Sequence, residues 1–238
     1  MVLESQTRDL RSSSAVSGLA EDIRNNTRAL LEELLVGLAE VTYVPAGDLV
    51  FRAGSEPGIA LVRLGIVRIY ICGAGGRQVT LRYARPGDLI GLGGLFGGSY
   101  AWRAEAVVDS SLEVLTVDQM QAVAALHPEL PWLIAEEIAV ASANAIATLA
   151  ESWSQPTASR VAHHLREMAM PTSDGRAVAH ISQQRLADAA GTAREVVSRE
   201  LHALRAQGVI ATTSQRVEIL DEELLERIAA GGVPTPES

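Results

Sequence analysis

An uninterrupted stretch in the middle of the chain constrains its architecture more than any other feature. Between Pro131 and Pro156 the sequence runs for 24 residues without glycine or proline. Prolines are excluded from helix interiors, so this stretch predicts one long helix of roughly 36 Å. Pro156 then marks a hinge. A chain with such a rod at its centre is expected to fold as two parts, one on either side of the helix.

The central stretch carries a narrow apolar seam at alternating spacings of four and three residues. The seam residues are Ile134, Ile138, Ala141, Ala145 and Thr148. Two interpretations fit: the helix packs on its own N-terminal part, or two copies of the helix pair in parallel. We favour the dimer seam, because the stripe is narrow and rich in small residues.

The sequence before the helix consists of short β-branched runs separated by glycines. The runs between residues 41 and 117 include Leu49–Phe51, Ala60–Val62, Val67–Ile71 and Val79–Leu81. Short strands at regular spacing with turn residues between them predict a small antiparallel barrel or roll. Residues 1–20 are polar and serine-rich and predict a flexible tail, and residues 21–40 have helical periodicity.

After the hinge, residues 181–208 have the pattern of two short helices joined at Gly191. The apolar residues on both sides of the turn can share one small core. With that core inward, Arg194, Glu195 and Arg199 fall on the outer face of the second helix's first turns, where a helix in the major groove meets the bases. Arginine pairs bidentately with guanine, and glutamate accepts a hydrogen bond from cytosine.

A second interpretation of the same residues is purely structural. Glu195 could close a capping box that begins at Thr192, and Arg199 could be an ordinary solvated charge. The segment that follows favours DNA readout. Residues 209–219 have the pattern of two short strands around the polar turn Thr212–Gln215, which is typical of a wing beside the second helix.

The formal net charge of −9 is unevenly distributed. Residues 1–155 hold 11 arginines against 18 acidic residues, whereas residues 156–219 hold 8 arginines against 6. An acidic body with a mildly basic C-terminal part repels DNA except where that part docks, which favours specific over indiscriminate binding.

Several classes of protein are not expected. Charged residues break the apolar stretches before they reach a membrane-spanning length, and the N-terminus lacks the apolar run of a secretion signal, so we expect no membrane and a cytoplasmic location. The single cysteine, Cys72, excludes an intrachain disulfide. Paired carboxylates, a nucleophile with a nearby base and metal-ligand spacing are all missing from the sequence, so no enzyme, metal or cofactor is expected.

A roll, a long central helix and a winged helix-turn-helix in this order resemble the CRP/FNR family of bacterial transcription regulators, over about residues 25–228. Two motifs carry the resemblance. The segment from Gly65 to Arg77, followed by the turn at Gly87–Gly91, is similar to the family's roll signature. Gly191 with Arg194, Glu195 and Arg199 is similar to its DNA-reading motif.

The resemblance implies an α+β fold in three parts after the tail: a β-roll sensor-like domain with flanking helices at residues 21–127, a dimerisation helix at 128–155 and a winged helix-turn-helix at 156–238. It also implies a homodimer on double-stranded DNA, with Arg194, Glu195 and Arg199 reading a palindrome of TGTGA-like half-sites. The candidate contacts to the DNA backbone are Ser182, Gln184, Ser198 and Arg216. The segment Thr172–Gly175 resembles a family loop that touches RNA polymerase.

The resemblance weakens where the family's cyclic-nucleotide sensors bind their ligand. The slot of the ribose-binding glutamate holds Leu92, and the slot of the phosphate-binding arginine holds Trp102. Leucine cannot accept the ribose hydroxyl, which costs roughly 1–3 kcal/mol, so control by cAMP is not expected. A one-residue slip would bring Arg103 into the phosphate slot. The candidate effector-pocket residues are Gly91, Leu92, Gly93, Trp102, Arg103 and Thr148, and the effector itself is unknown.

The leading hypothesis is therefore a homodimeric, sequence-specific transcription regulator without control by cAMP. Two alternatives stay open: a cyclic-nucleotide-responsive regulator, and a ligand-binding or protein-interaction module whose helix-turn-helix is only structural.

Overall fold

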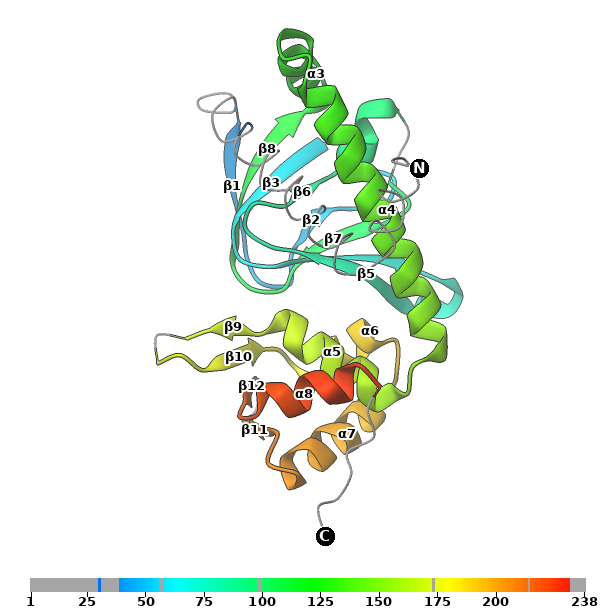
Figure 1. Ribbon diagram of the computed structural model, residues 1–238, viewed down its shortest axis with the longest axis vertical. Helices are drawn as coiled ribbons and strands as arrows, with labels where there is room; N and C mark the ends of the chain where they lie inside the picture. Colours follow the sequence, from blue (N-terminus) through cyan, green and yellow to red (C-terminus); the bar gives the residue numbers. More distant parts are fainter. Residues whose placement is uncertain are drawn as a thin grey trace, which may run out of the picture.

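A computed structural model describes residue 30 and residues 39–55, 58–97, 100–172, 174–213 and 215–231, and Figure 1 shows how they are arranged. The predicted tail at residues 1–20 lies outside the described residues. So does the predicted helical segment at 21–40, apart from Leu30 and the last two residues.

The N-terminal part is an antiparallel β-roll of two four-stranded sheets. The first sheet has the order β1 (Glu40–Val44), β8 (Ser110–Thr116), β3 (Gly58–Leu64) and β6 (Leu89–Ile90). The second has the order β2 (Leu49–Phe51), β7 (Arg103–Ala106), β4 (Val67–Cys72) and β5 (Gln78–Ala84). Short 3-10 turns lie at η1 (Ala74–Gly76) and η2 (Leu92–Phe96). All four runs singled out in the sequence lie in strands of the roll, so this prediction is confirmed.

Two glycines that follow strands of the first sheet allow the chain to pass close to the neighbouring strands β8 and β3. At Gly65, where φ is +93°, a Cβ atom would lie 2.2 Å from Ser110 Oγ. At Gly91, where φ is +91°, it would lie 2.1 Å from the carbonyl oxygen of Gly58. Since L-residues rarely adopt positive φ, both positions require glycine.

Helix α3 (Val117–Leu126) leads from the roll into the central rod, α4 (Leu130–Ser154). A capping box starts α3: the Thr116 hydroxyl accepts from the Gln119 N–H, and the Gln119 side chain accepts from the Thr116 N–H. Pro131 lies in the first turn of α4, where a missing N–H costs nothing, and the helix ends two residues before Pro156. The predicted long helix is therefore confirmed.

The predicted dimer seam of α4 faces its own roll, along which the helix runs in Figure 1. Ile134 is 2% exposed and belongs to a core cluster with Leu61 and Leu115, and Ile138 packs against the same cluster. The interpretation of Ile134 as a contact to a second copy is wrong, because the roll already covers it. The opposite side of α4 carries the exposed apolar side chains, including Trp132 and Ile146.

The segment Leu130–Leu149 is long and apolar enough to cross a membrane by length and composition, with a mean hydropathy of 1.3. It nevertheless contains Glu136 and Glu137, and one side of the helix packs on the roll. Only 6% of this segment is buried, so the helix presents an apolar surface that a single copy of the chain leaves uncovered.

The C-terminal part is a winged helix-turn-helix. It consists of α5 (Thr157–Met168), β9 (Met170–Pro171), β10 (Ala177–His180), α6 (Gln183–Ala190), α7 (Arg194–Ala206), β11 (Ile210–Thr212), β12 (Arg216–Ile219) and α8 (Glu222–Ala229). The two strands predicted as a wing are β11 and β12. They extend into a four-stranded sheet in the order β11-β12-β10-β9, which the sequence pattern did not indicate.

The two halves of the molecule share one hydrophobic core. Ile66, Tyr83 and Val107 of the roll belong to the same buried cluster as Leu165 of α5 and Leu186 of α6. Polar contacts surround this cluster: Arg85 donates to the carbonyl oxygen of Glu167, and Tyr83 Oη lies 2.9 Å from His164 Nδ1. The winged helix-turn-helix is thus docked on the second sheet of the roll.

Candidate DNA interface and effector cavity

The second helix of the helix-turn-helix, α7, begins at Arg194 and is anchored by its apolar face. Val197, Leu201 and Leu204 are buried in the shared core. Arg194, Glu195 and Arg199 are exposed on the opposite side of the first turns, and the Arg199 side chain is 72% exposed. The structure therefore brings the three predicted base-reading residues together on one open surface.

The capping-box interpretation of Glu195 is wrong. The N-cap of α7 is Ala193 rather than Thr192, and no side chain caps this helix. With Ala193 as the N-cap, Glu195 is the second helical residue, one position too early to close a capping box. Its carboxylate at the helix N-terminus is exposed and accepts no hydrogen bond from the described residues.

The turn before α7 depends on Gly191. This residue has φ +60° and ψ +40°, the left-handed conformation, and its N–H donates to carbonyl oxygens at the end of α6. The Thr192 N–H donates to the carbonyl oxygen of Ala187, 3.0 Å away, which completes the C-cap. The predicted turn is confirmed, and it fixes the direction in which α7 leaves α6.

Three of the four candidate contacts to the DNA backbone are exposed: Gln184, Ser198 and Arg216. The Gln184 side chain donates to Asp188 Oδ1 within α6, and Arg216 lies 3.7 Å from Glu218. Ser182 is instead the N-cap of α6, where its hydroxyl accepts from the Arg185 N–H. Its first role is to start that helix.

A cavity of about 270 Å³ lies between the roll and α4. It brings together four of the predicted effector-pocket residues, Gly91, Leu92, Gly93 and Trp102. From α4 it is lined by Glu137, Ile138, Ala141, Ser142 and Ala145, so most of the predicted seam faces this cavity. We call it the effector cavity.

The other two predicted pocket residues lie elsewhere. Arg103 is exposed on β7, because side chains alternate along a strand and its neighbours Trp102 and Ala104 point inward. Its side chain hydrogen-bonds Tyr70, whose pKa is raised chiefly by burial. The one-residue slip considered for Arg103 is therefore excluded. Thr148 lies farther along α4 and lines a second cavity, beside the winged helix-turn-helix.

Arg82 also lines the effector cavity, although the sequence pattern did not predict it as a pocket residue. Strand β4 pairs with β5 through a register shift between Ile69 and Tyr70, so that Ile69 lies opposite Arg82. This bulge turns Arg82 toward the cavity, where its guanidinium donates to the carbonyl oxygen of Leu89 and lies 3.8 Å from Asp88. Alternation alone could not indicate this position.

Aromatic side chains support one wall of the cavity. Trp102 stacks on Tyr100 with 4.2 Å between the ring centroids. The Tyr100 hydroxyl lies 2.9 Å from the Gly58 N–H and 3.1 Å from the carbonyl oxygen of Gly91. Tyr100 therefore belongs to the interior of the roll and fixes the position of Trp102, which itself faces the cavity.

Comparison with known proteins agrees with this organisation. Residues 41–127 match the family model of the cyclic nucleotide-binding domain, and residues 159–228 match that of the Crp-like helix-turn-helix domain. The transcriptional regulator LdrP of Thermus thermophilus is 32% identical over 184 residues, which cover 75% of this chain and 91% of LdrP. The cyclic AMP receptor protein of the same organism is 32% identical over 189 residues, covering 79% of this chain and 87% of that protein.

A crystal structure of a CRP/FNR-family transcriptional regulator from Thermus thermophilus is also similar, with a TM-score of 0.66 and 28% identity over 80% of this chain and 98% of that one. A cyclic-nucleotide-binding-type roll, joined by a long helix to a Crp-like helix-turn-helix, defines a class of DNA-binding transcription regulators. The chain belongs to the CRP/FNR family of this class.

Proposed function

We propose that the protein is a homodimeric regulator that reads a palindrome of TGTGA-like half-sites through Arg194, Glu195 and Arg199. The observation that carries the proposal is the exposure of these three side chains on the first turns of α7, opposite the buried Val197 and Leu201. Arginine and glutamate at the start of a major-groove helix suit G·C pairs. As a transcription regulator it would act in the cytoplasm.

Contacts to the phosphate backbone would position this helix. Gln184, Ser198 and Arg216 are exposed around it, and Ser182 begins α6 beside them. The mildly basic balance of residues 156–219 supports docking of this part on an acidic polymer. The β9–β10 turn holds an exposed ion pair between Asp174 and Arg176, 3.3 Å apart, and is the candidate contact to RNA polymerase.

The dimer would form through the outward side of α4. Trp132, Ala139, Ala143 and Ile146 are exposed there at spacings typical of paired helices, with Trp132 70% and Ile146 68% exposed. This side replaces the seam predicted from the sequence, since Ile134 is covered by the roll. A two-fold partner would place two copies of α7 on successive turns of the DNA.

The effector cavity favours a compact, largely apolar ligand rather than cAMP. Leu92 and Trp102 line the cavity, and by the resemblance they would stand where the family's cyclic-nucleotide sensors hold the ribose and the phosphate. Arg82 is the one lining arginine among the described residues, and Asp88 and the carbonyl oxygen of Leu89 already engage it. A cyclic phosphate would have to compete with both.

A cyclic-nucleotide-responsive regulator is the second candidate. It is favoured by the similarity to the T. thermophilus cyclic AMP receptor protein and by the position of Arg82 in the cavity. Thermal unfolding in the presence of cAMP or cGMP separates the two proposals. A saturable rise in Tm with either nucleotide, lost in Arg82→Ala, would support this second candidate.

The main proposal is tested by fluorescence anisotropy with labelled duplexes at one fixed salt concentration. We expect a duplex with a TGTGA…TCACA palindrome to bind at least about 10³-fold more tightly than a scrambled duplex of equal composition. Equal affinity for the two duplexes would contradict sequence-specific reading. Unchanged regulation by an Arg194→Ala, Glu195→Ala double variant would favour a helix-turn-helix with a structural role only.

A further inference from the structure

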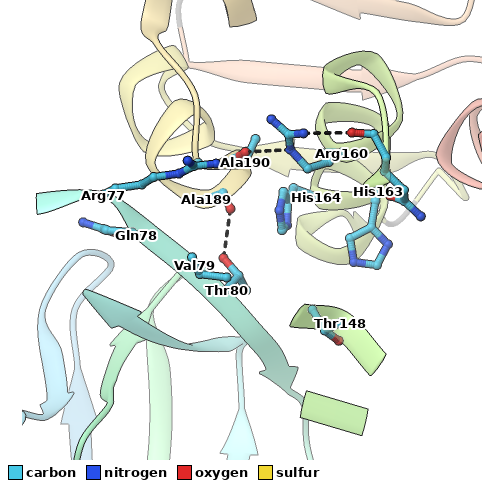
Figure 2. A pocket seen from close by; sticks show the side chains of 12 residues that line it. Arg77, Gln78, Val79, Thr80, Thr148, Arg160, His163, His164, Ala189 and Ala190 are labelled. Atoms are coloured by element: carbon cyan, nitrogen blue, oxygen red, sulfur yellow. Dashed lines mark hydrogen bonds between the residues drawn. The ribbon is translucent and has the colours of Figure 1, made fainter. Parts of the chain in front are cut away.

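A histidine is buried at the contact between the roll and the winged helix-turn-helix. His164 of α5 is 7% exposed, and Tyr83 of β5, on which it packs, is 8% exposed. Tyr83 Oη lies 2.9 Å from His164 Nδ1, and the two rings meet edge-on with 5.9 Å between their centroids. In Figure 2, His164 reaches from α5 toward β5. One member of this contact between the two halves can therefore change its charge near neutral pH.

The contact suits the uncharged imidazole. In a neutral ring one nitrogen has a free lone pair, so Nδ1 can accept the hydrogen of the Tyr83 hydroxyl. The imidazolium donates from both nitrogens and accepts from neither. Burial, followed by the nearby charges of His163, Arg68 and Arg160, holds the pKa of His164 well below 6.5. At neutral pH the docked halves therefore enclose a neutral ring.

The groups around His164 are mostly cationic. Arg68 reaches it from β4 and is itself only 4% exposed, while Arg160 and His163 belong to α5. Arg77, at the start of β5, lies near Arg160 and adds to the positive charge there. A proton on His164 would thus place a further positive charge among cations of both halves, which is unfavourable at a buried site.

The nearest acidic side chain on α5 is already paired. The carboxylate of Glu167, one turn after His164, lies 3.6 Å from both Arg85 and Arg166. On the side of α5 where α8 packs, Arg166 also pairs with Glu226. Within the described ranges, no carboxylate lies at ion-pair distance from His164. The docked arrangement therefore has no counter-charge placed to stabilise the imidazolium.

The winged helix-turn-helix can keep its own core if it leaves the roll. The roll contributes Ile66, Tyr83 and Val107 to the shared buried cluster, and the other fully buried members all belong to the winged helix-turn-helix. The connection between the halves is short: α4 ends at Ser154, and α5 begins at Thr157 directly after Pro156. Separation at this hinge is therefore a smaller change than unfolding of either half.

We propose that acidification releases the winged helix-turn-helix from the roll, because the docked halves exclude a proton that His164 takes up when they separate. An imidazole in water binds this proton at a pKa of about 6.5. The ratio of separated to docked copies should rise about tenfold for each pH unit below 6.5, until the pH reaches the lowered pKa of the docked ring. This pH-dependent release goes beyond base reading, since it determines whether α7 is held at a fixed position relative to the roll.

The test is thiol labelling of the full chain carrying Val107→Cys, at a position that is 7% exposed while the halves are docked. The exposed native Cys72 in the same chain corrects for the change of thiol reactivity with pH. A dipyridyl disulfide reacts with thiols in acid as well as at neutral pH. When the halves close faster than the reagent reacts, the labelling rate follows the population of the separated form. We expect the ratio of the rates at positions 107 and 72 to rise about tenfold per pH unit from pH 6.5 toward pH 5.

Three further variants serve as controls. Val62→Cys makes the same exchange inside the roll, at a position with 0% exposure, and should be labelled more slowly than Val107→Cys at every pH because it requires unfolding of the roll. His164→Asn, combined with Val107→Cys, removes the titrating ring and should abolish the pH dependence, whatever its effect on the rate at neutral pH. His202→Gln removes an exposed histidine of α7 and should keep the profile of the parent.

Three outcomes would overturn the proposal. The first is a ratio that stays constant down to pH 5, or labelling of Val107→Cys that stays undetected. The second is an equal pH dependence with His164→Asn. The third is equal labelling of Val62→Cys and Val107→Cys, since pH would then act on unfolding of the whole chain rather than on release. None of these measurements involves DNA, so they are independent of the operator proposed above.

Discussion

At the scale of single residues, Arg199 gives the sharpest test of base reading. Replacing it with alanine should lower affinity for the palindrome by about 1–3 kcal/mol and relax specificity at one guanine per half-site. Anisotropy with duplexes substituted at each position would measure both effects. The control is Arg227→Ala, which removes an exposed arginine from α8. A uniform loss over all duplexes would instead assign Arg199 to the DNA backbone.

His164 makes stability depend on pH. The imidazole is buried beside Tyr83 Oη, and burial, followed by the neighbouring His163 and two arginines, holds its pKa well below 6.5. In the unfolded chain the same group takes up a proton near pH 6.5, so the unfolded state binds more protons below that pH. The free energy of unfolding should therefore be greatest above pH 6.5 and fall as the pH decreases from there.

Urea unfolding between pH 8 and pH 5 would measure this dependence. His164→Asn should flatten the acid side of the profile, although the loss of the contact to Tyr83 should lower stability at every pH. His202→Gln is the control, since His202 is exposed on α7 and should leave the profile unchanged. An equal slope in the parent and in His164→Asn would contradict the assignment.

At the scale of elements, the outward side of α4 predicts the oligomeric state. Ile146→Glu should convert the dimer to a monomer of 25.2 kDa, because a carboxylate would be buried without a partner between the two helices. Sedimentation equilibrium would measure the mass. Val41→Glu is the control, an exposed apolar residue on β1. A parent chain that sediments as a monomer would contradict the dimer itself.

The spacing of apolar residues predicted most helices and strands, but not which parts of the molecule pack against them. The runs of strands, the long helix and the turn at Gly191 follow from local spacing and glycine chemistry, and the structure has all of them. The side of α4 that a second copy could reach did not follow from spacing. Two stripes at spacings of four and three lie on opposite sides of the helix, and only the position of the roll distinguishes Ile134 from Ile146.

For the candidate sites, too, the sequence predicted only the features that depend on local spacing. The exposure of Arg194, Glu195 and Arg199 could be predicted from the sequence, because it depends only on which face of one helix is apolar. The place of Arg82 in the effector cavity and the second cavity, lined by Thr148, could not be predicted, since a bulge in β5 and the docking of two distant segments create them. Contacts between residues far apart in the sequence produce no periodic pattern that a sequence analysis could detect.

At the scale of the whole molecule, Arg68 ties the roll to the helix-turn-helix. It is 4% exposed; its Nε donates to Thr80 and its Nη2 to the carbonyl oxygen of Asp188 at the end of α6. Thr80 in turn donates to the carbonyl oxygen of Ala189. A cation at a helix C-terminus is favourable, so this network stabilises the docked arrangement.

Arg68→Met should therefore lower the free energy of unfolding by about 1.5–3 kcal/mol, the range for hydrogen bonds from a charged group. Urea unfolding would give the value, with Arg52→Met as the control because that arginine is exposed. We expect proteolysis near Pro156 to accelerate in Arg68→Met, since the hinge opens when the halves separate. A change below about 0.5 kcal/mol is typical of a surface position and would contradict this role.

The hydrophobic core that both halves share opposes their separation, because separation would expose its side chains to water. If the winged helix-turn-helix moved away from the roll, Ile66, Tyr83 and Val107 would be exposed to water. Exposing each such side chain costs about 1.5–3 kcal/mol. A ligand that drives this separation must bind the separated arrangement more tightly than the docked one, by a free energy similar to the sum of these costs. Cooling and urea both weaken apolar burial, so a fluorescence distance across the hinge should lengthen under either condition. Temperature and solutes would then act on the position of the reading helix directly, alongside any effector.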